Sequence, residues 1–228
     1  MELREYMSVR RAYNLVRQDT ESERRLTFEE FAILCRLDNS EEPIKTSDIA
    51  DYQGALRPTM THRTNHLASL GLIDRGEGVV DRRNIVCSIS EEGRSYAQQL
   101  SVQTRAFIAT GQPLARTSPE RLRRYVDAMG SVYCTAGELV LLALNMDPEQ
   151  PCAITQLVER LGLLQPTVSM SVGTLAERGL VTRNRENVSS ARSALIYLTD
   201  EGRDRAESIS GRIAEIIVRR RPRSESVK

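Results

Sequence analysis

The feature that most restricts the fold of this chain is an internal repeat. When the 228-residue sequence is shifted by 108 positions, residues 43–75 align with residues 151–183 with ten identities in 33 positions. The similarity extends upstream and, after one inserted residue, downstream, so the repeated unit is about a hundred residues long. Two copies of this length are too few and too long for a solenoid. The sequence therefore predicts two domains of one fold.

Each copy carries the pattern of a helix-turn-helix. The first helix is indicated by apolar residues at helical spacing, which are Phe28, Phe31, Ala32 and Cys35 in the first copy and Leu139, Leu142, Ala143 and Met146 in the second. A short second helix is predicted over residues 47–52, behind Thr46 as its N-cap. Gly54 is placed to end this helix and Pro58 to open the third, and Gly162 and Pro166 repeat both signals.

The third helix is followed in each copy by two short strands and a further helix. Two helices joined by a tight turn and followed by a β-hairpin form a winged helix-turn-helix, in which the second helix of the motif usually enters the major groove of DNA. The predicted fold class is mainly α with small β-hairpin wings (α+β), arranged as two tandem winged helix-turn-helix domains.

Charge and cysteine content exclude several other classes. The chain has 32 Lys+Arg, 31 Asp+Glu and a formal net charge of +1, which argues against a disordered chain or a highly basic nucleic-acid coat. Its four cysteines have no CxxC spacing, so neither a zinc knuckle nor a disulfide framework is indicated, and Cys35 and Cys87 are expected in the core. No apolar run is long enough for a membrane helix, and the charged N-terminus lacks the apolar region of a secretion signal. A cytoplasmic location is expected.

Three segments resemble a known family. Leu67-Ala68-Ser69-Leu70-Gly71-Leu72-Ile73, Asp81-Arg82-Arg83 and Ser88-Ile89-Ser90-Glu91-Glu92-Gly93 resemble the pattern of MarR-type transcriptional regulators. The second copy keeps residues 175–181 and 198–202 of this pattern, but Ser190-Ala191-Arg192 replaces the Asp-x-Arg of the wing. The tandem arrangement is similar to the two-domain members of the related SarA group.

The resemblance implies how the two copies are joined. Family members carry one copy and dimerise through terminal helices, so a fused chain would supply both half-sites as a pseudo-symmetric monomer, with a further homodimer left open. The apolar series Tyr6, Val9, Tyr13, Val16 and Ala206, Ile209, Ile213, Ile216 have the spacing of helix seams. We expect a first domain over residues 1–112 and a second over 113–228, whose first helix (118–133) is shared with the end of the first.

The third helix and the wing of each copy are the predicted DNA-binding elements. Met60, Thr64 and Leu67 are expected to face inward. The predicted DNA-binding residues of the first copy are Arg57, Thr59, Thr61, His62, Arg63, Asn65, His66, Arg82 and Arg83, and those of the second are Gln165, Thr167, Ser169, Ser171, Arg183, Arg185 and Arg192. The third helix of the second copy is short of charge, so the first copy is expected to dominate sequence readout and the second to contact mainly the DNA backbone. The basic tail, residues 219–223, is either a phosphate-binding segment or a frayed terminus.

The function predicted on these grounds is a sequence-specific, double-stranded DNA-binding regulator that represses transcription. Two alternatives stay open: a winged-helix protein-interaction module and a tandem winged-helix replication initiator. No catalytic constellation is found, and His62 and His66 lack a nearby third metal ligand, so no enzyme, metal or cofactor is expected. Family resemblance implies a small-molecule effector, often phenolic, which the sequence does not identify.

Overall fold

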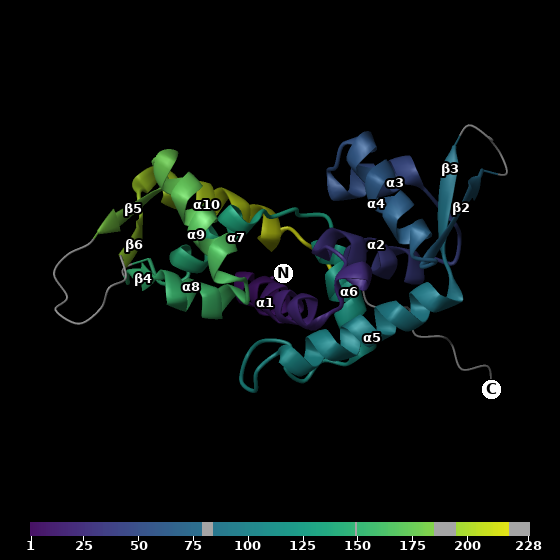
Figure 1. Cartoon of the computed structure of the whole chain (residues 1–228), viewed down its shortest axis with the longest axis horizontal. Helices are drawn as coiled ribbons and strands as arrows, with labels where there is room; N and C mark the ends of the chain where they lie inside the picture. Colours follow the sequence, from purple (N-terminus) through teal and green to yellow (C-terminus); the bar gives the residue numbers. More distant parts are fainter. Residues whose placement is uncertain (79–83, 149, 185–194, 219–228) are drawn as a thin grey trace.

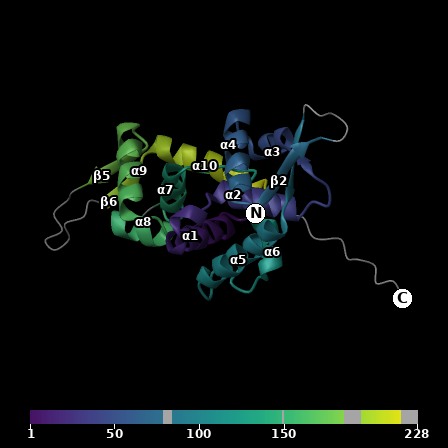
Figure 2. The same ribbon diagram turned by 45° about the vertical axis from the view of Figure 1, so that its right-hand side comes forward.

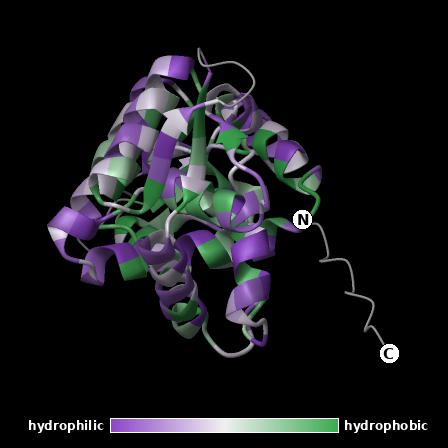
Figure 3. Cartoon of the chain, turned by 90° about the vertical axis from the view of Figure 1, so that its right-hand side faces the viewer, coloured by the Kyte–Doolittle hydropathy of each residue, from purple (hydrophilic) through white to green (hydrophobic). Residues whose placement is uncertain are grey.

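The computed structural model describes residues 1–78, 84–148, 150–184 and 195–218. Two winged helices lie at opposite ends of the molecule, and helix α1 (Leu3–Asp19) lies between them (Figure 1). In the part of the chain that the structure describes, no helix is both long and apolar enough to cross a membrane. Figure 3 shows hydrophobic segments inside the first winged helix and hydrophilic faces on its outer helices.

The elements of the two copies correspond one to one, which confirms the repeat. The first copy consists of α2 (Phe28–Asp38), β1 (Ile44–Lys45), α3 (Thr46–Gln53), α4 (Arg57–Ser69), β2 (Ile73–Glu77) and β3 (Ile85–Ile89). The second consists of α7 (Ala136–Asn145), β4 (Cys152–Ala153), α8 (Ile154–Leu161), α9 (Gln165–Glu177), β5 (Val181–Asn184) and β6 (Leu195–Leu198). Each copy forms an antiparallel three-stranded sheet, ordered β1-β3-β2 or β4-β6-β5. The predicted fold class is confirmed.

The turn between the two helices of each motif requires a glycine. Gly54 and Gly162 end α3 and α8 with φ of 58° and 60°, in the left-handed region that favours glycine. The prediction that Thr46 is the N-cap of α3 is wrong, because the helix begins at Thr46 and Lys45 takes the cap position. The Thr46 hydroxyl instead donates to the carbonyl of Ile85 at 3.2 Å, which ties α3 to strand β3.

The remaining helices connect the two copies. These are α1, α5 (Glu91–Phe107), α6 (Pro119–Met129) and α10 (Asp200–Ala214), with a short 3-10 turn at Ser22–Arg24. Helix α1 packs along α5 and also contacts α8 and α10 of the second copy, whereas α6 packs on α2 and α5 of the first (Figures 1 and 2). Both apolar seams predicted from the sequence are buried. The helix predicted over 118–133 is shorter, since Gly130 follows its last residue.

Buried polar groups of α1 hold the segment that leads into the second copy. The Tyr6 hydroxyl donates to the Val132 carbonyl at 3.1 Å, and Arg10 donates to the Cys134 carbonyl at 3.3 Å. Arg10 also pairs with Glu29 at 3.4 Å and lies over the Phe28 ring. A buried charge is tolerated when it is paired and hydrogen-bonded in this way.

All four cysteines are buried as free thiols. Burial raises the pKa of Cys35, Cys134 and Cys152 above its ordinary value. A raised pKa lowers the fraction of thiolate, the reactive form. The expectation that Cys35 and Cys87 are core residues is confirmed.

Candidate nucleic-acid interface

Helix α4 is anchored by one apolar side and presents the opposite side to solvent. Met60, Thr64 and Leu67 are buried, as predicted, and the Thr64 hydroxyl donates to the Met60 carbonyl at 3.0 Å, so this buried hydroxyl is paired. Five of the predicted DNA-binding residues of α4 are exposed: Arg57, Thr59, Thr61, His62 and Asn65. They carry donors and acceptors of the kind that read base edges in a major groove.

Two further predicted DNA-binding residues of α4 are half-buried and engaged with neighbouring helices. Arg63 is half-buried, donates to the Gln53 side chain of α3 at 2.9 Å, and lies 6.0 Å from the Tyr133 ring centre. His66 lies with Nδ1 2.6 Å from a carboxylate oxygen of Glu30 in α2. The helical spacing of Thr59, His62, Arg63 and His66 predicts one outward polar face, and this prediction is wrong for Arg63 and His66. Gln53 and Glu30 are buried and need polar partners, which α4 supplies.

A residue pair beside α4 differs between the two copies. The Arg75 guanidinium of β2 donates to the side-chain oxygen of Asn65. At the equivalent positions of the second copy, Arg183 lies over Gly173, with its Nη2 3.4 Å from the place that a Cβ would occupy. Arg75 was missed by the sequence analysis, although the repeat aligns it with Arg183, which was selected.

Helix α9 has the same anchoring but a different outer surface. Val168, Val172 and Leu175 are buried, as Met60, Thr64 and Leu67 are in α4. The predicted residues Gln165 and Arg183 are exposed, and Thr167, Ser169 and Ser171 are half-buried.

The most exposed large apolar side chains near α9 are not among the predicted DNA-binding residues. Met170 is 75% exposed and occupies the position of His62. Leu164 lies in the helix-helix turn, and its equivalent Leu56 is exposed as well.

The wing residues Arg82, Arg83, Arg185 and Arg192, and the basic tail at 219–223, lie outside the described residues. Their DNA-binding roles stay predictions. Within the described ranges, no group of three His, Cys, Asp or Glu residues is arranged to hold a metal ion.

Two family models match the chain, one in each copy. Models described as "MarR family" match residues 26–85 and residues 139–193, which together make up about half of the chain. The chain belongs to the MarR family. The two matches contain the two helix-turn-helix motifs described above, so the tandem arrangement agrees with this assignment.

Solved structures of transcriptional regulators are also similar to parts of this MarR-family chain. BldR from Sulfolobus solfataricus is 24% identical over 37% of this chain and 60% of its own, with a TM-score of 0.35. PcaV from Streptomyces coelicolor is 26% identical over 47% and 80%, with a TM-score of 0.35. CouR from Rhodococcus jostii RHA1 is 19% identical over 56% and 85%, with a TM-score of 0.36. No curated protein matches the sequence.

Proposed function

We propose that this MarR-family protein is a double-stranded DNA-binding repressor whose two winged helices contact two half-sites from one chain. The observation that carries the proposal is the outer face of α4. There, Arg57, Thr59, Thr61, His62 and Asn65 are exposed on the second helix of a helix-turn-helix, the element that enters the major groove in this motif.

The anchoring of α4 supports its role as a reading helix. Its inner residues are buried, and Arg63 and His66 tie its flank to α3 and α2. A rigid helix can hold its exposed side chains at fixed positions against base edges, which base-specific hydrogen bonds require. Arg63 and His66 thus position the helix, whereas His62, which is exposed at the centre of α4, is the best-placed reader of bases.

Helix α9 would read its half-site with different chemistry. Its central exposed residue is Met170, and apolar side chains recognise the methyl group of thymine in the major groove. Arg183, exposed beside α9, is suited to a phosphate contact. We therefore expect α4 to recognise its half-site through hydrogen bonds to base edges, and α9 to recognise a half-site that contains thymine.

The same exposed apolar residues favour a second candidate, in which the second copy binds a protein. Met170 and Leu164 are 75% and 56% exposed, and exposed apolar groups are typical of protein interfaces. In that case the protein would recognise DNA through one half-site only.

Selection of bound fragments from random double-stranded DNA tests the proposal. The selection is made at about 50 and 200 mM salt, because six to ten phosphate contacts would lower affinity about 10³- to 10⁵-fold between them. We expect enrichment of two half-sites at a fixed distance. Enrichment of a single half-site would favour the second candidate, and no enrichment at either salt concentration would contradict sequence-specific DNA binding.

A further inference from the structure

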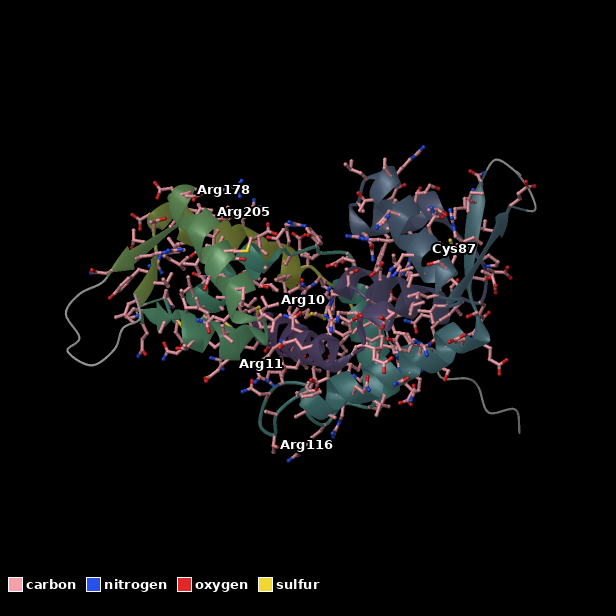
Figure 4. All side chains as sticks on the ribbon, viewed as in Figure 1. Arg10, Arg11, Cys87, Arg116, Arg178 and Arg205 are labelled. Carbon is pink, nitrogen blue, oxygen red and sulfur yellow. The ribbon has the colours of Figure 1, made fainter. Side chains whose placement is uncertain are left out.

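Helix α1 makes a set of contacts with the second copy, and none of the described residues makes such contacts at the equivalent turn of the first copy. Three side chains on one side of α1 donate to backbone carbonyls where α8 ends. Arg11 donates to Glu159 at 2.7 Å, Asn14 to Leu161 at 2.8 Å and Gln18 to Gly162 at 2.6 Å. In Figure 4, Arg11 lies where α1 meets the second copy.

These contacts meet a specific chemical need of α8. The last carbonyls of a helix lack intrahelical partners and carry partial negative charge, which donors and cations stabilise. Both helices end with backbone bonds: in the first copy Gly54 donates to Asp51 at 3.2 Å and Ala55 to Ala50 at 2.9 Å, and in the second Gly162 donates to Val158 at 2.9 Å. At the end of α8, α1 supplies three donors from outside the motif.

The backbones of α1 and of the second motif also come unusually close. A Cβ at Gly162 would lie 2.7 Å from the Arg11 carbonyl oxygen and 3.1 Å from Leu15. A Cβ at Gly54 would have no atom within 4 Å. Both glycines have nearly the same positive φ, so the difference between them is the contact with α1.

Helix α1 is firmly attached to the first copy as well. Its Tyr13 ring stacks on Phe31 of α2 with centroids 5.0 Å apart, and its Arg10 pairs with Glu29. The helix therefore bridges the first copy and the helix-helix turn of the second.

We propose that Arg11, Asn14 and Gln18 of α1, seated on Gly162, form a clamp that fixes the orientation of the second helix-turn-helix relative to the first. Where the protein binds two half-sites, as proposed above, the clamp sets the one spacing at which both reading helices fit the duplex. Arg11, Asn14 and Gln18 are positioning residues, since they contact the end of α8 and not the exposed face of α9.

A distance measurement tests the clamp without DNA. Spin labels are attached to the full chain through Ser69→Cys on α4 and Glu177→Cys on α9, which are exposed, repeat-equivalent positions, while the four native cysteines are buried. Double electron–electron resonance is then recorded for otherwise native protein, Gly162→Ala, Gly54→Ala and the double variant Asn14→Ala/Gln18→Ala. We expect a narrow distance distribution for native protein and Gly54→Ala, and a broad or shifted one for the other two.

The Gly54→Ala control separates the clamp from backbone strain. Both glycine variants place alanine at positive φ, but only Gly162→Ala meets α1. The double variant leaves both turns unstrained, so it tests the clamp even if Gly162→Ala fails to fold. Narrow, unshifted distances in the double variant would overturn the proposal, as would equal broadening in Gly54→Ala and Gly162→Ala.

Binding to duplexes that carry the two half-sites at different separations then links the clamp to function. Native protein should prefer one separation, and the double variant should lose that preference while it still binds. An unchanged preference would overturn the clamp as the determinant of spacing. If native protein binds none of the duplexes better than random DNA, the proposed function fails, and the distance measurement still decides the clamp.

Discussion

The two copies have nearly the same backbone and different outer surfaces. Helices α4 and α9 have equal length, begin at equivalent residues and bury three equivalent positions. Their exposed positions differ, with His62 against Met170 and Arg57 against Gln165, and the exposed Asn65 corresponds to the half-buried Gly173. Residues that build the motif are constrained by packing and backbone geometry, whereas exposed ones are not. The comparison teaches that one helix-turn-helix backbone can present two recognition helices whose exposed side chains differ in chemistry.

The strongest effect is expected where both copies need the same glycine. A Cβ at Gly93 would lie 1.9 Å from the Leu72 carbonyl oxygen, and one at Gly202 would lie 1.9 Å from that of Leu180. Because the obstacle is backbone in each case, we expect Gly93→Ala and Gly202→Ala each to lower the free energy of unfolding by about 3 kcal/mol, measured by urea denaturation.

Gly211→Ala is the matched control, since it lies in α10 with nothing within 4 Å of its Cβ position. It should raise stability by about 0.5 to 1 kcal/mol, because alanine is favoured over glycine inside a helix. A large loss in only one of the two glycine variants would break the structural equivalence of the copies.

The next effect concerns base recognition by α4. His62→Ala removes the exposed ring at the centre of the helix, and we expect it to reduce discrimination at one base pair of the first half-site by about 1 to 3 kcal/mol. Quantitative binding to single-base variants of the selected site measures this. If discrimination between bases is unchanged at every position of that half-site, His62 does not contact a base.

Arg63 should behave differently from its neighbour, because its guanidinium is paired with Gln53. We expect Arg63→Ala to lower the free energy of unfolding by about 1 kcal/mol, the usual net contribution of a hydrogen bond, and to remove discrimination at no single base pair, because Arg63 positions α4 and contacts no base. Thermal or urea denaturation and the same binding panel test both parts. Relaxed specificity at one base pair with unchanged stability would instead make Arg63 a base reader.

The smallest effect tests the apolar reading of the second half-site. Replacing thymine by deoxyuridine removes one methyl group, and loss of its contact with Met170 should cost about 0.8 kcal/mol. The affinity loss should be seen with native protein and be absent in Met170→Ala, whereas His62→Ala, the matched variant in α4, should retain it. Equal losses in native protein and Met170→Ala would exclude a methyl contact by Met170.

Much of the fold could be predicted because each residue that starts or ends a helix occurs at equivalent positions in both copies of the repeat. The Pro58 and Pro166 helix starts and the Gly54 and Gly162 turns all lie where expected. The inward orientation of Arg63 and His66 could not be predicted, because their partners are on other helices. Neither could the seating of α1 on Gly162, since a contact between distant segments leaves no periodic pattern.

Exchange of half-sites tests most directly the claim that α4 and α9 recognise different half-sites. Affinity is measured for the selected duplex and for two symmetrised duplexes, one with two copies of the half-site bound by α4 and one with two copies of that bound by α9, at the same separation. The account predicts that the asymmetric duplex binds more tightly than both, and that His62→Ala and Met170→Ala each weaken a different half. A symmetrised duplex that binds as tightly as the asymmetric one would contradict it.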